Sequence, residues 1–490
     1  MCVLPHRFRA RVHVGCCRNG PSIGSMGTPE AAVRPHQPTM HSTLRQKLMT
    51  GGSALALTLA MLAGCAGPNA NSEAKPGDPK AAASGPVEVM VFKGGYGSDF
   101  YEKAAEEFTA AGGAKVQVIG DPRIDQQVQP RMQRGSPPDL MYPGWRFDHW
   151  KAVDDGAIMD LTEVMKSPAA DGADAWGDTF EPALLKLGQS EGKQYVLPYF
   201  YSVIGWWYDP DLFKERGWEV PKTYPELLAL CEKVKAAGMA PITYQGQYPD
   251  YMISGMLTPW LISAGGIEAY NACQSLEPGA WKAPAVVQAA RMIQELAAKG
   301  YYQTGATAMS HTEAQAEFVN RRAAMIPCGT WLHSEMRGSM PEGRRMAFFL
   351  PPVIPGGKGD PTAVMVKIEP WMVPAHAKNS AAAIDYFKFL TTKAKAQQFV
   401  TEKGTLMAIK GANEVELPDY LQGAAAAVSA SGATYAPIWR EWYPSLYKTV
   451  EGAITELLNG KLTAQQFADK IEAEAEKLRN DDAVVKRKVS

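Results

Sequence analysis

The strongest pattern of apolar and polar positions lies in the middle of the chain, between residues 195 and 266. Residues 199–208 are aromatic or β-branched except for one serine and one glycine, which is typical of a buried strand. Asp209 and Pro210 follow directly. Because proline lacks an amide hydrogen but fits the first turn of a helix, we expect the strand to end here. A short helix should then begin, with Asp209 as its N-cap and Gly217 as its stop.

A second helix and a polar loop complete this central stretch. Thr223 and Glu226 have the spacing of a capping box, and an apolar face continues from there to Gly238. A short strand at 240–244 leads into the loop 245–251, which is dense in hydrogen-bonding and aromatic side chains. Ligands of open α/β sheets bind beyond the carboxyl ends of strands, so this loop is the first candidate for a binding site. A helix over 252–263 would support it.

The segments before the central stretch alternate between strand and helix patterns. We expect strands at 87–91, 115–119 and 138–142, with helices at 99–111 and 123–133 between them. This order predicts an α/β lobe with a largely parallel sheet. The other expected elements are helices at 160–166, 180–187, 284–299, 312–320, 380–390 and 393–402, strands at 323–331 and 365–371, and two C-terminal helices broken at residues 459–460.

The N-terminal residues have the pattern of an exported protein. Residues 1–39 precede a second methionine and show no apolar period, so we interpret them as an over-called leader. Residues 40–64 carry two basic residues and then an uncharged apolar stretch, as a signal peptide does. The residues before Cys65 match a bacterial lipobox, which predicts a lipid on Cys65 and a membrane anchor; a plain secretory signal is the alternative. Residues 65–85 contain no large apolar side chain and read as a flexible linker.

The net charge and the absence of known catalytic motifs limit the classes of function that this chain could have. The chain has 50 basic and 51 acidic residues; removing residues 1–64, with seven basic and one acidic, leaves 43 and 50, a net charge of about −7. This balance argues against nucleic acid as a partner. No nucleophile elbow, phosphate loop or zinc motif is present, so we expect no cofactor and no metal. The four histidines after Cys65, His149, His311, His333 and His376, are scattered singly. Three cysteines remain after Cys65, enough for one disulfide or for buried thiols: Cys231, Cys273 and Cys328.

Several segments of the central stretch resemble the family 1 extracellular solute-binding proteins, the sugar-capturing components of ABC importers. They are Trp-Trp-Tyr-Asp at 206–209, Leu-Phe-Lys-Glu-Arg-Gly-Trp at 212–218, Pro-Lys-Thr-Tyr-Pro-Glu-Leu-Leu at 221–228, and the aromatic loop before Trp260. The resemblance covers nearly all of residues 86–480. Within the family, Ile-Thr-Tyr-Gln-Gly-Gln-Tyr-Pro at 242–249 is similar to the subgroup that binds N-acetylglucosamine and chitobiose.

The resemblance implies an α/β, two-lobed periplasmic-binding-protein-like fold of class II. Each lobe would be a mostly parallel sheet flanked by helices, with a hinge between the lobes. Chain order places residues 86–200 with 371–415 in lobe 1 and residues 206–362 with 416–480 in lobe 2. Residues 481–490 form a tail.

A sugar ring needs flat aromatic faces for its C–H bonds and polar groups for its hydroxyls, so we expect strand ends and loops to supply both. The resemblance implies that the loop 245–251 holds the sugar, that Trp331 stacks on it, that residues 142–145 face it from the other lobe, and that segment 439–447 adds a last aromatic contact. The predicted ligand-binding residues are Tyr96, Tyr142, Trp145, Gln245, Gln247, Tyr248, Asp250, Tyr251, Trp331, Glu369, Trp371 and Trp442.

The expected function is capture of a carbohydrate in the cleft between the lobes and its delivery to the permease subunits of an ABC transporter. A sugar that bridges both lobes would stabilise their closed arrangement, no bond would be made or broken, and the protein would act as a monomer. Alternatives are a binder of malto- or xylo-type oligosaccharides, a binder of iron or polyamines on the same architecture, and a secreted carbohydrate-active enzyme.

Overall fold

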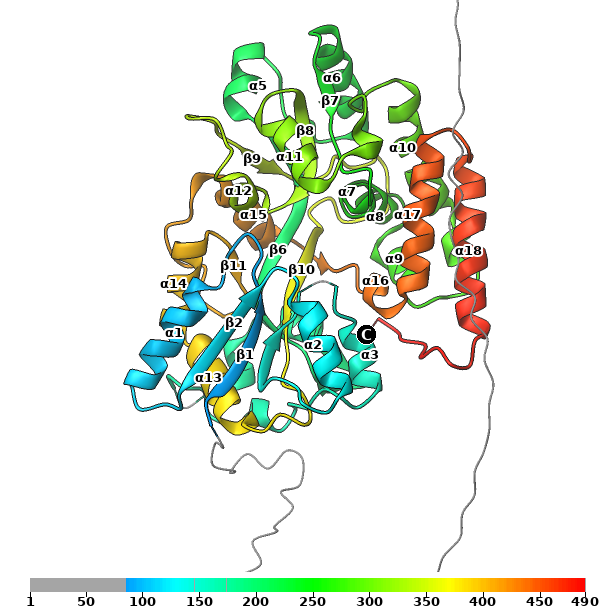
Figure 1. Ribbon diagram of the computed structural model, residues 1–490. Helices are drawn as coiled ribbons and strands as arrows, with labels where there is room; N and C mark the ends of the chain where they lie inside the picture. Colours follow the sequence, from blue (N-terminus) through cyan, green and yellow to red (C-terminus); the bar gives the residue numbers. More distant parts are fainter. Residues whose placement is uncertain (1–84, 145, 173, 490) are drawn as a thin grey trace, which may run out of the picture. The chain divides into compact units, whose positions relative to one another are not determined.

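The computed structural model describes residues 85–489 except 145 and 173 (Figure 1). The predicted leader, signal peptide and lipid site at Cys65, nearly all of the linker, and Trp145 lie outside the described residues. The described residues belong to one unit by their internal contacts. Among the helices of the described part, none is both long and apolar enough to cross a membrane.

The first sheet confirms the predicted parallel order. Strand β1 (Val87–Phe92) lies between β2 (Val116–Asp121) and β3 (Leu140–Tyr142), and both pairings are parallel. Helices α1 (Asp99–Ala110) and α2 (Ile124–Gln133) make the crossovers (Figure 1). The elements that follow, up to the central strand, are α3 (His149–Asp154), η1 (Val164–Lys166), η2 (Trp176–Thr179), α4 (Pro182–Lys186), β4 (Gln189–Ser190) and β5 (Lys193–Gln194).

The second sheet is built on β6 (Leu197–Tyr208), the strand predicted from the aromatic run. Its order is β12-β10-β6-β8-β7, with β10 at Val364–Trp371, β8 at Ala323–Gly329 and β7 at Ala240–Ile242. The other strands are β9 (Ala347–Phe349), β11 (Leu406–Met407) and β12 (Thr434–Tyr435). Strand β6 is antiparallel to β8, β9, β10 and β11, while β10–β12 and β7–β8 are parallel. This sheet is therefore mixed rather than mostly parallel, because β6 and β10 traverse the molecule in opposite directions.

Helices account for most of the remaining chain. Their bounds are α5 (Pro210–Arg216), α6 (Tyr224–Ala236), α7 (Asp250–Met252), η3 (Ile253–Leu257), α8 (Thr258–Gly265), α9 (Ile267–Gln274), η4 (Ala280–Lys282), α10 (Pro284–Ala298), η5 (Ala306–Ala308), α11 (His311–Val319), α12 (Leu332–Met336), α13 (Ser380–Leu390), α14 (Lys393–Lys403), α15 (Asp419–Ala430), α16 (Trp439–Trp442), α17 (Pro444–Leu458) and α18 (Ala464–Asn480).

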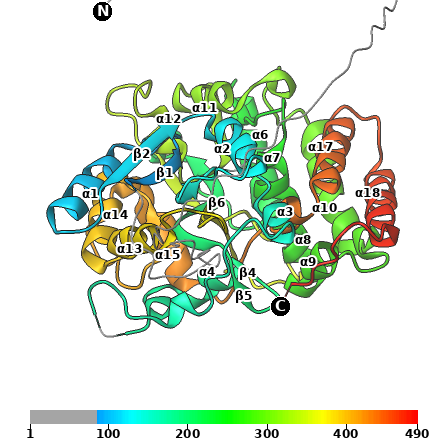
Figure 2. The same ribbon diagram turned by 60° about the horizontal axis from the view of Figure 1, so that its bottom comes forward.

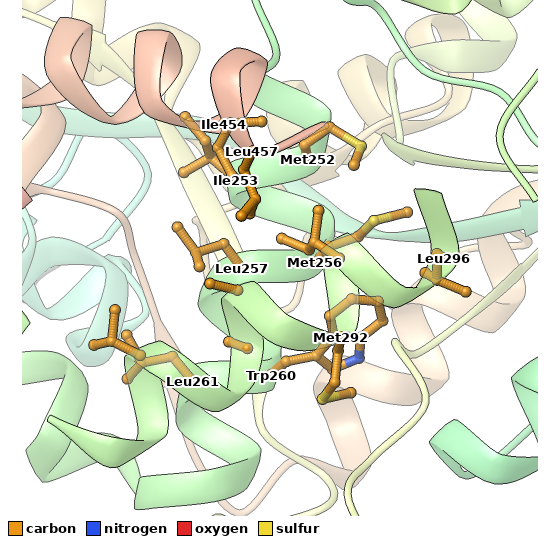
Figure 3. Close-up of a cluster of buried hydrophobic side chains, with 14 of the residues drawn as sticks. Met252, Ile253, Met256, Leu257, Trp260, Leu261, Met292, Leu296, Ile454 and Leu457 are labelled. Atoms are coloured by element: carbon orange, nitrogen blue, oxygen red, sulfur yellow. The ribbon is translucent and has the colours of Figure 1, made fainter. Parts of the chain in front are cut away.

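Two large hydrophobic cores lie at opposite ends of β6. The start of the strand, with Leu197 and Tyr199, belongs to a core shared with β1, β3 and α13. Its end, with Trp206, belongs to a core shared with α8, α10, α17 and α18. Figure 3 shows part of the second core, to which η3, α8, α10 and α17 contribute side chains that include Trp260. Burying each large apolar side chain stabilises the fold by about 1.5–3 kcal/mol, so both ends of β6 are firmly anchored.

The local start and stop signals are confirmed. The Asp209 carboxylate accepts hydrogen bonds from the amides of Asp211 and Leu212, and Thr223 and Glu226 form the predicted capping box. The expected helix at 252–263 begins at Asp250 and contains a π-helical turn, η3, before α8. Of the two cysteine alternatives, the structure shows buried free thiols at all three described positions.

Candidate binding site

Asp250 is the centre of a hydrogen-bonded cluster at the end of the loop 245–251. Its carboxylate accepts from Arg440 Nη1 at 2.9 Å, from the Tyr447 hydroxyl at 2.6 Å and from Ser254 Oγ at 3.3 Å. The side chains of Asp250 and Arg440 are only 18% and 11% exposed. Burial acts to raise the pKa of Asp250, but the Arg440 charge and the Tyr447 hydrogen bond hold that pKa below its usual value. The cluster therefore keeps an ionised carboxylate in a partly dry site.

A second carboxylate, Glu369 on β10, lies beside the first sheet. It accepts a hydrogen bond of 2.8 Å from the hydroxyl of Tyr142 on β3. Burial raises the pKa of Glu369 above its usual value, although the positive charge of Lys367 opposes the shift. Tyr142 and Glu369 were both predicted site residues, and the structure brings them together.

Trp371 does not fulfil its prediction. Its side chain is 0% exposed. Two of its aromatic neighbours, Tyr142 and Phe387, stack on it at ring distances of 5.7 and 5.0 Å and interplanar angles of 16° and 17°. The end of β10 that carries Trp371 lies in the same core as Leu197 and Tyr199 of β6. Trp371 is therefore a core residue and cannot offer its face to a ligand.

Trp331 is anchored beside a third carboxylate. Its indole Nε1 donates to the Tyr251 hydroxyl at 3.5 Å, and the same hydroxyl accepts from Gln315 Nε2 at 2.9 Å. Gln315 also donates to Glu335 at 2.6 Å, and burial raises the pKa of Glu335. A Cβ atom at Gly329 would lie 2.0 Å from the Trp331 ring, so the absence of a side chain there lets the indole lie against the strand.

Lys367 on β10 connects these groups electrostatically. Its positive charge opposes protonation of four carboxylates: Asp250, Glu335, Glu369 and Glu441. Glu441 on α16 pairs with His149 on α3 at 3.2 Å. Burial acts to raise the pKa of Glu441, but His149 and nearby Arg440 and Lys367 hold it below its usual value. Carboxylates from β10, α12, α16 and the loop 245–251 thus share the influence of one lysine charge.

The other predicted residues of the loop 245–251 hold the loop in place. Gln245 is 1% exposed and accepts from the Tyr251 amide at 3.3 Å. Gln247 is exposed and donates to the Ala308 carbonyl at 3.0 Å, and the Tyr248 hydroxyl bonds His311 Nδ1. These contacts fasten the loop to the end of η5 and the start of α11.

The remaining two predicted residues lie elsewhere around the cluster. Tyr96 is partly buried and packs edge-on against Phe200 at 5.3 Å. Trp442 on α16 is partly buried and packs against the core that contains Trp260 and against the cluster around Trp150. For these residues, contact with a ligand stays a prediction.

A cavity of about 460 Å³ lies beside Tyr96, and its volume is within the 300–1,000 Å³ usual for small-molecule sites. Its wall includes Tyr96 and two segments that approach each other, the loop 93–97 and the end of α12. A Cβ atom at Gly95 would lie 3.2 Å from Glu335 Cγ, so the loop lies directly against α12. The full lining is Lys93, Gly94, Gly95, Tyr96, Gly97, Asp99, Pro122, Arg337 and Lys403. A second cavity, of about 620 Å³ along α10, contains none of the predicted residues.

Sequence reasoning missed several members of the cluster. Arg440 and Tyr447 lie in the segment 439–447, which had been singled out for its aromatic residues alone. Lys367 was also missed. It lies two positions before the predicted Glu369 on the same strand, a spacing that places both side chains on one face, and this signal was present in the sequence. Among the described residues, no group of three or more histidine, cysteine or acidic side chains could hold a metal ion.

Comparison with known proteins identifies the family. Residues 94–397 match the family described as bacterial extracellular solute-binding protein. The chain belongs to this family. This solute-binding protein is 26% identical over 467 residues to the diacetylchitobiose binding protein NgcE of Streptomyces coelicolor, which covers 91% of this chain and 98% of the relative.

Solved structures agree on the fold. A chitin oligosaccharide binding protein superimposes with a TM-score of 0.64 at 22% identity, covering 77% of this solute-binding protein and 94% of the other chain. The solute-binding protein RafE in complex with raffinose gives a TM-score of 0.63 at 19% identity, covering 79% and 98%. The predicted two-lobed class II α/β fold is therefore confirmed. The residue bounds of the two lobes stay a prediction.

Proposed function

We propose that this solute-binding protein captures a carbohydrate, with N-acetylglucosamine or chitobiose as the best candidates, and delivers it to the permease of an ABC transporter. The observation that carries the proposal is a set of contacts that joins an aromatic side chain to fixed polar groups. Trp331 is linked through Tyr251 and Gln315 to Glu335. The charge of Lys367 acts on Glu335 and also on Asp250 and Glu369, which come from distant segments. An aromatic face and a set of fixed polar groups are what a sugar ring requires. The names of the chitobiose- and chitin-binding relatives support the choice of sugar.

The mechanism follows from where the polar groups come from. Tyr142 belongs to the first sheet, Asp250 and Trp331 belong to segments packed on the second core, and Glu369 lies on β10, which reaches both. A ligand that contacts all of them interacts most strongly when the two halves are together. Its differential affinity therefore shifts the equilibrium toward the closed arrangement, which the permease would recognise.

Calorimetric titration of residues 66–490 with N-acetylglucosamine, chitobiose, maltose, xylobiose and glucose tests the proposal. We expect binding of the N-acetylated sugars, loss of that binding in Trp331→Ala, and partial retention in Trp331→Phe, which keeps a flat ring. Phe108→Ala is the matched control, because it removes a partly buried aromatic ring on α1 that packs against Phe389 instead of the cluster. Binding of maltose or xylobiose instead would keep the importer function and reject the chitin-derived sugar. Hydrolysis of a chromogenic chitobioside would indicate an enzyme.

The proposal includes a lipid anchor on Cys65, which would hold the protein at the outer surface of the membrane that contains the permease. The lipobox pattern before Cys65 supports it. Fractionation of cells that express the full chain should find the protein with the membrane and the Cys65→Ser variant in the soluble fraction. Equal partition of the two would reject the anchor.

A further inference from the structure

The last residues of the chain connect parts of the molecule that belong to different cores. After α18 ends at Asn480, the tail 481–489 runs back to α3 and α16, and Figures 1 and 2 show its end beside α3 and β4. Helix α18 packs in the core around Trp260. Helix α3 contributes Trp150 to a different cluster, which also contains Met90 of β1 and Met141 of β3. The tail therefore spans from one half of the protein to the other.

Arg487 makes the contacts with α3 and β4. Its guanidinium donates to Asp154 Oδ1 and, at 2.5 Å, to Ser190 Oγ, and it lies 5.1 Å from the centre of the Trp150 ring. The Arg487 side chain is only 9% exposed. An arginine that is nearly buried, forms an ion pair and also lies over an indole ring is held more tightly than an ordinary surface cation.

The backbone of the tail is fixed to the other half. The Arg487 amide donates to the Tyr443 hydroxyl at 2.9 Å, and the Val489 amide donates to Ser275 Oγ at 3.2 Å. Tyr443 directly follows α16, the helix that carries Arg440 and Glu441 into the candidate binding site. The same residue of the tail thus contacts α3 with its side chain and the end of α16 with its backbone.

We propose that the tail 481–489 is a strap between the two halves and that Arg487 is a positioning residue for ligand binding. By holding α16 against α3, Arg487 keeps Arg440 and Glu441 where a ligand meets them and favours the closed arrangement. Arg487 and the ligand both stabilise the closed arrangement, and their effects add. The strap therefore lowers the rate at which a bound ligand dissociates. The effect on ligand binding rests on the proposed function. The link that the tail makes between the two halves does not depend on it.

The test compares Arg487→Ala with Lys488→Ala, the matched control, which removes a neighbouring exposed cation of the same tail. We expect Arg487→Ala to raise the radius of gyration of the ligand-free protein in small-angle scattering. We also expect it to weaken binding of the sugar found by calorimetry by about fivefold or more, mainly through faster dissociation in stopped-flow fluorescence. The charge-exchanged double variant Asp154→Arg, Arg487→Asp should recover part of both effects.

The possible outcomes distinguish a failure of the strap proposal from a failure of the proposed sugar binding. If the wild-type protein binds no sugar of the panel, the proposed sugar-binding function fails, while the scattering comparison still decides about the strap. If Arg487→Ala and Lys488→Ala agree in scattering and in affinity, the strap is refuted. A lower melting temperature of Arg487→Ala with unchanged affinity and dissociation rate would make Arg487 a merely stabilising residue and would also overturn the inference.

Discussion

Removing the Arg440 side chain should destabilise the folded protein strongly, because it would leave Asp250 as a mostly buried carboxylate without its cation. The two groups are 2.9 Å apart, and neither side chain is more than a fifth exposed. Breaking a buried ion pair from one side typically costs 3–5 kcal/mol. Asp250 keeps two hydroxyl donors, Tyr447 and Ser254, so we expect Arg440→Ala to cost about 3 kcal/mol of unfolding free energy, at the lower end of that range. Tyr447→Phe removes only one hydrogen bond to the charge and should cost about 1.5 kcal/mol.

A double-mutant cycle measures the pair itself. Urea unfolding, followed by tryptophan fluorescence, would be compared for Asp250→Asn, Arg440→Met and the double variant, with Lys448→Ala on α17 as an exposed control. The double variant leaves neither charge of the pair without its partner. Its decrease in unfolding free energy should therefore be smaller than the sum of the two single-variant decreases by about 1 kcal/mol or more. Additivity within about 0.5 kcal/mol would show that Asp250 and Arg440 do not act as a pair and would refute the reasoning.

The pH dependence of stability provides a second check, this time on Arg440→Ala. The pKa of Asp250 is lowered in the folded protein, so its contribution to stability is present above the ordinary aspartate pKa of about 3.9 and is lost as the pH falls through the folded value. Arg440→Ala should remove much of this contribution. The difference in stability between wild type and variant should therefore be largest near neutral pH and should shrink below about pH 4. A difference that is constant with pH would point to lost packing instead of lost charge pairing.

Two further predictions concern the neighbouring groups. Gly329→Ala should displace the Trp331 ring, because the new methyl group would overlap the indole. We expect a loss of about 1–3 kcal/mol of unfolding free energy in thermal or urea unfolding, together with weaker sugar binding. An unchanged sugar affinity would show that the position of the ring is unimportant for binding. Glu369→Gln should stabilise the protein near neutral pH, since the raised pKa of Glu369 means that its contribution falls as the pH rises from about 4.3 through the folded value. The gain should vanish near pH 4 in melting curves, and a gain that persists there would contradict the assignment to charge.

Local signals in the sequence predicted the fold well where neighbouring residues decide the structure. Asp209 and the pair Thr223 and Glu226 begin their helices as expected, because a helix start depends on side chains three residues apart. The direction of the strands beside β6 could not be predicted in the same way. Strand β10 begins more than 150 residues after β6 ends, and nothing in either segment specifies that the two run antiparallel.

The site shows the same limit at the level of single side chains. Asp250 was found from its place in a loop after a strand, but its partners Arg440 and Tyr447 are 190 and 197 residues away in the chain. Trp371 was chosen as a candidate because it is an aromatic residue at the end of an expected strand. That end of β10 lies in the core around Tyr199 instead, and Tyr142 and Phe387 stack on the indole. Residue type and spacing therefore predict candidates, whereas pairing and register need the structure.

Strand β10 is the common frame of the candidate site. One end of it, at Met365, packs with the core around Trp260, and the other end, at Trp371, packs with the core around Tyr199. Lys367 and Glu369 lie between these two anchors. A rotation of the halves about β6 and β10 would move Asp250 and His149 apart while leaving Lys367 and Glu369 nearly in place. We therefore expect a ligand to engage the groups of β10 first, and closure to add Asp250, Trp331 and the α16 residues around it.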